Sequence, residues 1–201
     1  MPATGPIGTR RKQRKELKTM LPPIPSWDGL HPLIIHFPIA LLLVAPLLVL
    51  LGIFLPGKGR AFLISAFILM LIGTVAAYIA ASTGEAAGEL AERLPGVEPV
   101  LEQHEELAET TQVVFSVLTG IFGVIVFAPL IFRKELTRTI LIPLNLAFLL
   151  FYGAGVVLLI NTAHQGGLLV HQYGVRAMMP VTAQSNSPTN TQRSRHADDD
   201  D

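Results

Sequence analysis

The chain has 201 residues, of which 50% are hydrophobic and 15% are charged, and its formal net charge at pH 7 is zero. This composition is more apolar than that of an ordinary soluble domain and favours an integral membrane protein. Balanced charge gives no general field that would attract nucleic acid, so no nucleic-acid partner is expected. The lack of cysteine excludes disulfides, thiolate metal sites and covalent attachment of a c-type haem to this chain.

Both ends of the chain are polar. Basic residues gather between Arg10 and Lys18, and the proline-rich sequence LPPIPSWDG follows them. The apolar run after this segment is too long for the hydrophobic region of a signal peptide, and no A-x-A-like cleavage site follows it. We therefore predict a flexible basic and proline-rich tail over residues 1–27, with Trp27 at the level of the lipid headgroups. Residues 177–201 contain too little apolar material to fold and are expected to be disordered.

Four apolar runs lie between the tails, at about residues 31–55, 61–82, 111–132 and 139–163. Each run has about 22–25 residues, and at 1.5 Å per residue a helix of that length extends ~33–37 Å, enough to cross a ~30 Å hydrocarbon core. The prolines in these runs are compatible with helices, because neighbouring helices can bond to the backbone groups that a proline frees. The runs predict an all-α fold, a four-helix transmembrane bundle within residues 28–176.

The connections between the runs differ in length and charge. Those at 56–60 and 133–138 are short and basic, whereas the one at 83–110 is long and carries eight glutamates between Glu85 and Glu109. The positive-inside rule places the short basic loops in the cytoplasm. The acidic connection and both termini are then expected on the periplasmic side of a bacterial inner membrane. The basic run of the N-terminal tail argues for the opposite orientation, but most of it lies well before the first helix.

Histidines gather at one side of the predicted bundle, where the first and third helices begin and the second and fourth end. Five of the six are placed there, namely His31, His36, His104, His164 and His171. His36 lies inside the first predicted helix, so we expect its side chain at membrane depth, facing the interior and a partner. His31 is about 140° away from it around a helix of 3.6 residues per turn and is interpreted as an interfacial cap.

Imidazole is the usual ligand of iron, copper and zinc, and two histidines from different helices can hold a haem axially. The candidate ligands are His36, His104, His164 and His171, of which at most two would bind a haem iron. Gly166 and Gly167 lie between the last two of these histidines. They are included as candidate cofactor-binding residues, because glycine lets a flat macrocycle or another backbone approach closely.

Three of these features together resemble domain-of-unknown-function family 2231, a family of four-helix membrane proteins. They are H-P-x-x-x-H-F-P at residues 31–38, a histidine before the third helix, and G-G-x-L-V-x-x-x-G-V at residues 166–175. Many members have tyrosine and histidine where this chain has His171 and Tyr173. The form H-x-G-G-x-L-x-H found here is similar to the branch fused to c-type cytochrome domains. That similarity implies redox work in a membrane and a b-type haem.

Two function classes follow from the sequence. The leading hypothesis is an electron-transfer protein that holds one haem b near one membrane face. Its partner would be a c-type cytochrome or a larger respiratory or photosynthetic complex, and the acidic connection could dock a basic partner. The alternative is a structural or accessory subunit of a membrane complex with no cofactor, whose histidines form a hydrogen-bonded network.

A third and weaker option is a non-haem copper, zinc or iron site at His104 with Glu105 or Glu109. Catalysis by the chain itself is not predicted. The sequence shows no Ser/His/Asp arrangement, phosphate-binding loop or paired-carboxylate motif that would support it.

Overall fold

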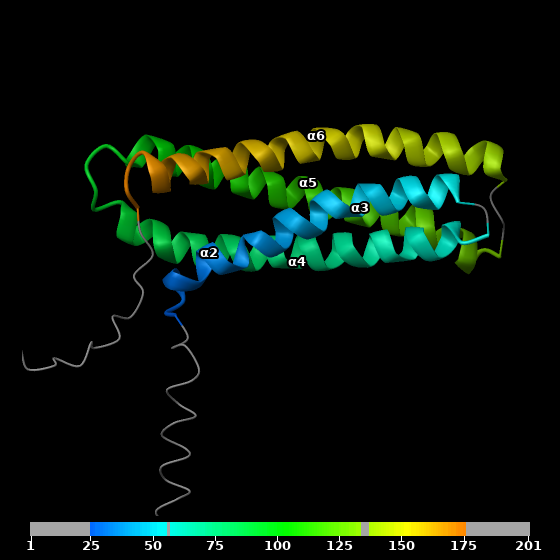
Figure 1. Cartoon of the computed structure of the whole chain (residues 1–201), viewed down its shortest axis with the longest axis horizontal. Helices are drawn as coiled ribbons and strands as arrows, with labels where there is room; N and C mark the ends of the chain where they lie inside the picture. The colour runs from blue at the N-terminus through cyan, green and yellow to red at the C-terminus, as the bar shows by residue number, and fades with distance from the viewer. Residues whose placement is uncertain (1–24, 56, 134–136, 176–201) are drawn as a thin grey trace, which may run out of the picture.

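The computed structural model describes residues 25–55, 57–133 and 137–175. Its helices are η1 (Asp28–Leu30), α2 (His31–Ile34), α3 (His36–Phe54), α4 (Gly59–Ala91), α5 (Glu98–Ile131) and α6 (Arg138–His171). The first three follow one another as a single span, so the described chain holds four helices long and apolar enough to cross a membrane, and no strand (Figure 1). The predicted all-α four-helix bundle is confirmed. Most of the predicted N-terminal tail and all of the predicted C-terminal tail lie outside the described residues.

Apolar side chains from all four spans meet along the axis of the bundle. Aromatic rings of α5 and α6 form its centre, where Phe115 lies edge-to-face on Tyr152 and Phe122 stacks on Phe148. The outer surface is also apolar. Large exposed side chains there include Leu47, Ile72, Val124, Leu150 and Phe151. Helices that are apolar on all sides fit a lipid environment, since such a surface would not be stable in water.

Pro46 lies inside α3, and its missing N–H leaves the carbonyl of Leu42 without an intrahelical partner. The hydroxyl of Tyr152 on α6 donates to that carbonyl oxygen at 2.7 Å. Both residues are buried, with Leu42 at 0% and Tyr152 at 1% exposure. A neighbouring helix therefore satisfies the freed carbonyl, as the sequence analysis expected.

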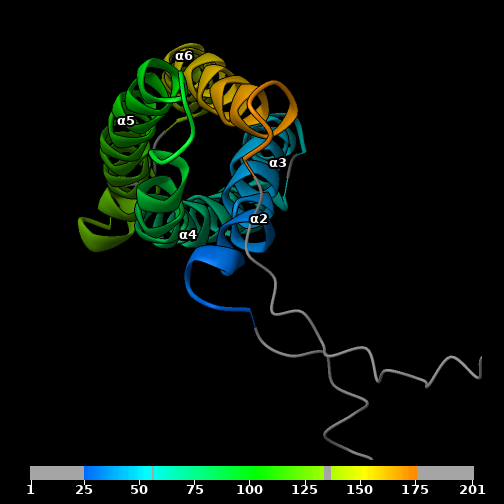
Figure 2. The ribbon, with the colours of Figure 1, turned by 90° about the vertical axis from the view of Figure 1, so that its left-hand side faces the viewer.

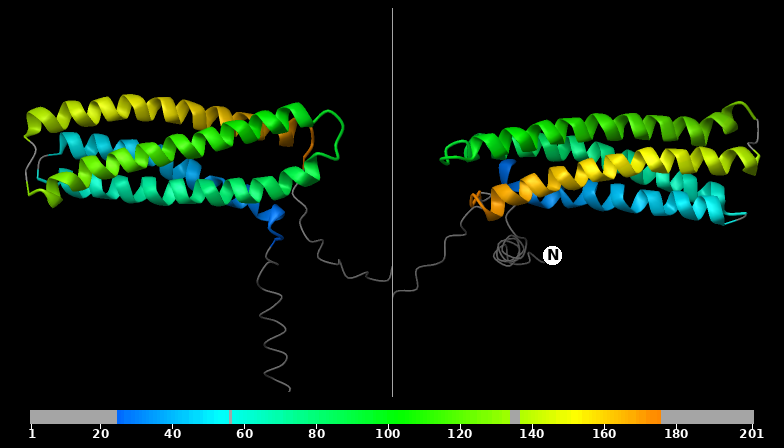
Figure 3. Two further views of the ribbon diagram at one scale, coloured as in Figure 1. Left: turned by 180° about the vertical axis from the view of Figure 1, so that it is seen from behind. Right: turned by 90° about the horizontal axis from the view of Figure 1, so that it is seen from above.

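The helices are longer than the apolar runs of the sequence. α4 continues to Ala91 and α5 begins at Glu98, so most of the acidic connection is helical and only residues 92–97 join the two helices. α5 has 34 residues, which corresponds to about 51 Å at 1.5 Å per residue, against ~30 Å of hydrocarbon. The ends of α4, α5 and α6 extend past the start of α2 (Figure 3), so we expect them to project beyond the hydrocarbon core on that side.

Consecutive helices are neighbours around the bundle, and α6 closes the ring against α3. Figure 2 shows this ring from the end at which α2 begins. In the part of the chain that is described, α2 contacts α4 but neither α5 nor α6. At this end α2 therefore packs on α4, and α4 in turn packs on α5, where Gly88 lies against Leu101.

Candidate functional site

His31 is the first residue of α2, and its ring lies against α4. Its Nδ1 atom is 2.8 Å from the carbonyl oxygen of Ala80 and 3.2 Å from the hydroxyl oxygen of Thr83. A carbonyl oxygen can only accept, so Nδ1 carries the proton and donates it. In the neutral ring the lone pair is then on Nε2. The Thr83 hydroxyl is directed to backbone carbonyls of its own helix, which leaves its oxygen free to accept from the ring.

His104 on α5 is held against α6 in the same way. Its Nδ1 atom is 3.0 Å from the carbonyl oxygen of Thr162, so this ring too donates from Nδ1 and keeps its lone pair on Nε2. The side chain of Thr162 adds a second polar link between the two helices, because its hydroxyl lies 2.8 Å from that of Thr111. His104 is thus fixed by a group of partly buried polar contacts rather than exposed on a charged surface.

Each ring lies on a glycine of the helix that accepts its hydrogen bond. A Cβ atom added at Gly84 would be 2.9 Å from Cε1 of His31, and one added at Gly166 would be 3.1 Å from Cε1 of His104. Both distances are shorter than the ~3.5–4.0 Å of normal carbon–carbon contact. The sequence analysis expected Gly166 and Gly167 to let a macrocycle or another backbone approach closely. The structure places an imidazole ring on Gly166, whereas Gly167 has open space, and a cofactor-binding role for either glycine stays a prediction.

The two rings come from different spans and lie at the same end of the bundle. They are near enough for a charge on His31 to act on His104. Both rings are half-buried, and no described residue forms a hydrogen bond with Nε2 of either one. Metal-binding histidines usually donate their second ring N–H to a carbonyl or carboxylate, which fixes the tautomer and the ring orientation. The pair therefore offers two oriented Nε2 lone pairs.

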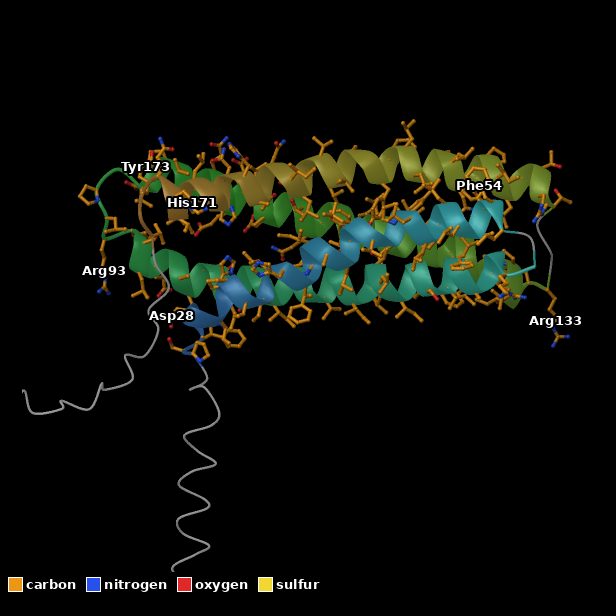
Figure 4. The ribbon with its side chains drawn as sticks, in the orientation of Figure 1. Asp28, Phe54, Arg93, Arg133, His171 and Tyr173 are labelled. Atoms are coloured by element: carbon orange, nitrogen blue, oxygen red, sulfur yellow. The ribbon has the colours of Figure 1, made fainter. Side chains whose placement is uncertain are left out.

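The other three predicted ligands are exposed. They are His36 at the start of α3, His164 on α6, and His171, the last residue of α6. Figure 4 shows His171 at the same end of the bundle as Tyr173 and Arg93, opposite Phe54 and Arg133. A ligand role for these three residues stays a prediction.

The exposure of His36 differs from the interior position expected for it. The first span is interrupted at Ile35, between α2 and α3, and Pro38 is buried two residues after the exposed histidine. The sequence analysis assumed one continuous helix over this span and therefore did not predict the break. It is therefore His31, on the short α2 segment, that reaches a helix partner.

Sequence reasoning did not include His31 among the ligands and interpreted it as a cap on a headgroup or a loop carbonyl. Its partner is instead a carbonyl inside α4. The usable signal is a glycine four residues after the accepting carbonyl, in AASTG at 80–84 and in TAHQG at 162–166. Such spacings are common in apolar helices, so the signal becomes specific only when the helix opposite is known.

Within residues 25–55, 57–133 and 137–175, no three His, Cys, Asp or Glu side chains are placed to hold a metal ion together. The described residues therefore contain no such cluster for a non-haem site that combines His104 with Glu105 or Glu109. A haem iron needs only axial ligands from the protein, because the macrocycle supplies the other four. The chemistry of two imidazoles fits that requirement.

A family model for predicted membrane proteins, DUF2231, matches residues 28–178. The chain belongs to this family. The match begins at Asp28, where η1 begins, and contains all four spans and the histidine pair. The resemblance found in the sequence motifs is thereby confirmed. No curated protein and no solved structure matches the chain.

Proposed function

We propose that the protein is an integral membrane electron-transfer protein that holds one b-type haem through His31 and His104, near one membrane face. The observation that supports the proposal is a set of two half-buried rings at one end of the bundle, each tied at Nδ1 to a backbone carbonyl of a different helix. A haem held by these two imidazoles would supply a one-electron redox centre. In this proposal the chain is an electron carrier and not an enzyme.

The protein's own contribution is to position the two ligands. The carbonyls of Ala80 and Thr162 hold the two rings in the Nδ1–H tautomer. Because His31 is on α2 and His104 is on α5, which do not contact each other, a group bound by both would add a link between these two helices. The rings lie near the end of the apolar run of α4, which supports a cofactor at the membrane border and not at its centre.

The surroundings suit exchange with a basic partner. The projecting ends of α4 and α5 and the connection between them carry eight glutamates between Glu85 and Glu109, close along the chain to Gly84 and His104. Negative charge attracts a basic redox protein to this end and raises its rate of encounter. We propose a c-type cytochrome or a larger respiratory or photosynthetic complex as the partner, on the periplasmic side of a bacterial inner membrane.

The test is an optical spectrum of the full chain purified in detergent, oxidised in air and then reduced with dithionite, with the haem quantified as its pyridine haemochrome. We expect a Soret band, sharp α and β bands on reduction, and close to one haem per chain. A protein that stays colourless after expression with added haem would contradict the proposal.

Single alanine variants then identify the ligands. His31→Ala and His104→Ala should each lose the six-coordinate spectrum, because each removes one axial nitrogen. His36→Ala, His164→Ala and His171→Ala serve as controls and should keep it, since these side chains are exposed. If a control variant loses the six-coordinate spectrum and His31→Ala and His104→Ala keep it, the protein still binds haem but His31 and His104 are not its ligands.

The accessory-subunit hypothesis also has an observation in its favour. The hydrogen bonds of His31 and His104 tie neighbouring helices, and the indole of Trp27 adds a third tie by donating to the carbonyl of Ser82 at 3.3 Å. If these bonds are purely structural, His31→Ala and His104→Ala lower the melting temperature of a colourless protein. A haem spectrum in the wild type distinguishes the two functions.

A further inference from the structure

The two histidines are held by the same arrangement, repeated in two parts of the chain. In each case the histidine is on the first helix of a helical hairpin, and the second helix provides a carbonyl and, four residues later, a glycine. Ala80 and Gly84 on α4 serve His31, whereas Thr162 and Gly166 on α6 serve His104. We propose that Gly84 and Gly166 are positioning residues that set the orientation of the two axial ligands. This inference rests on the proposed haem function.

Backbone conformation does not explain these two glycines. Among the described residues, the glycines with positive φ are Gly57, Gly96 and Gly174, all outside the helices. Gly84 and Gly166 have ordinary helical backbone, in which alanine is the more stable residue. Their value to the structure is therefore the space above the backbone, which the rings of His31 and His104 occupy.

The space and the hydrogen bond act on the ring together. In a helix, the carbonyl of one residue points towards the residue four positions later, so a side chain there would stand beside the accepting oxygen. A glycine at that position leaves the carbonyl accessible and lets the ring lie flat against the helix. A methyl group would stand 2.9 Å from Cε1 of His31 or 3.1 Å from Cε1 of His104. The ring must then shift, and its Nε2 atom shifts with it.

The chain offers matched controls. Gly120 on α5 and Gly153 on α6 are also helical, but a Cβ added at either one meets nothing within 4 Å. Gly120→Ala and Gly153→Ala make the same chemical change without touching a histidine. Gly153 lies on the same helix as Gly166, so this pair also controls for effects on α6 as a whole.

The first measurement is the spectrum of the haem-loaded full chain. We expect Gly84→Ala and Gly166→Ala to convert part of the six-coordinate signal to a five-coordinate, high-spin one, and the reduced protein to bind carbon monoxide. Gly120→Ala, Gly153→Ala and the wild type should stay six-coordinate and bind carbon monoxide at least tenfold more slowly. The two glycine variants should have similar effects, because the two arrangements are alike. If Gly84→Ala and Gly166→Ala both have the spectrum of the wild type, the inference is overturned.

The second measurement does not need the cofactor. In apo protein labelled with ¹⁵N-histidine, the NMR spectrum should show His31 and His104 as hydrogen-bonded Nδ1–H tautomers. Gly84→Ala should change the signal of His31 alone, and Gly166→Ala that of His104 alone. If the wild type binds no haem but these shifts occur, the haem proposal fails while the glycines still position the rings. If the shifts are absent, the positioning role is wrong whatever the haem result.

Discussion

The two histidines of the candidate site, His31 and His104, form hydrogen bonds with uncharged partners. Both imidazoles donate to backbone carbonyls, and no described carboxylate forms a hydrogen bond with either ring. Near a membrane, a neutral acceptor avoids the cost of placing an ion in a medium of low polarity. Pro46 gives a second example, because the carbonyl of Leu42 that it leaves unpaired accepts a hydrogen bond from the uncharged hydroxyl of Tyr152. Orientation in this bundle thus depends on uncharged hydrogen bonds.

The bond from Tyr152 to the Leu42 carbonyl gives a prediction at this scale. Tyr152→Phe keeps the ring contacts with Phe115 and Phe148 but leaves a buried carbonyl without a donor. We expect the free energy of unfolding in detergent to fall by about 1–2 kcal/mol.

The control is Tyr78→Phe. The hydroxyl of Tyr78 also forms a hydrogen bond, to Ser116 at 3.0 Å, but its side chain is 49% exposed. Loss of this hydrogen bond in Tyr78→Phe should lower the free energy of unfolding by less than half as much as Tyr152→Phe does. An equal effect of the two variants would mean that burial of the Leu42 carbonyl adds no cost.

At the scale of elements, the projecting helix ends have a core of their own. Ala91, Val97, Leu101 and Leu169 are buried together, apart from the main core. Leu101 also contacts α4, where a Cβ added at Gly88 would be 3.4 Å from its Cδ1 atom. These contacts hold the acidic ends of α4 and α5 together beyond the lipid, against the mutual repulsion of their glutamates.

Leu101→Ala tests this second core. We expect local opening of the projecting ends to become easier by about 2 kcal/mol, and amide hydrogen exchange over residues 98–110 to quicken roughly 30-fold. Exchange in the lipid-embedded part of α5 should stay unchanged. Leu94→Ala is the control, since Leu94 lies in the connection and is 39% exposed. Exchange that quickens along the whole of α5 would show that the ends are not a separate unit.

The sequence predicted the spans well because lipid requires long, continuously apolar helices, and their composition carries that signal. The lengths of α4, α5 and α6 were underestimated, because their ends are stabilised by the small buried cluster that contains Leu101 and Leu169 and not by an apolar run. Selecting the histidine pair was harder still. It depended on the break at Ile35 and on which face of α4 meets α2, and neither property follows from the residues of one helix.

At the scale of the whole molecule, all the described histidines lie towards one end of the bundle, and the basic residues Lys58, Arg60, Arg133 and Arg138 lie at the other. The positive-inside rule predicts that the histidine end faces the periplasm. This orientation decides which partners can reach the site, because a soluble periplasmic cytochrome and a cytoplasmic donor approach opposite ends. The basic N-terminal run predicts the reverse, so the question needs a direct test.

The absence of native cysteine makes that test clean. Leu94→Cys places one thiol in the connection between α4 and α5, and Thr137→Cys places one just before α6, at the opposite end; both side chains are exposed and neither change alters the charge. In intact spheroplasts, a membrane-impermeant maleimide should label Leu94→Cys fully and Thr137→Cys only after lysis. The opposite result would put the acidic helix ends and the histidine pair in the cytoplasm. A periplasmic cytochrome would then be excluded as the direct partner, whereas the histidine pair itself would be unaffected, because its hydrogen bonds are internal to the bundle.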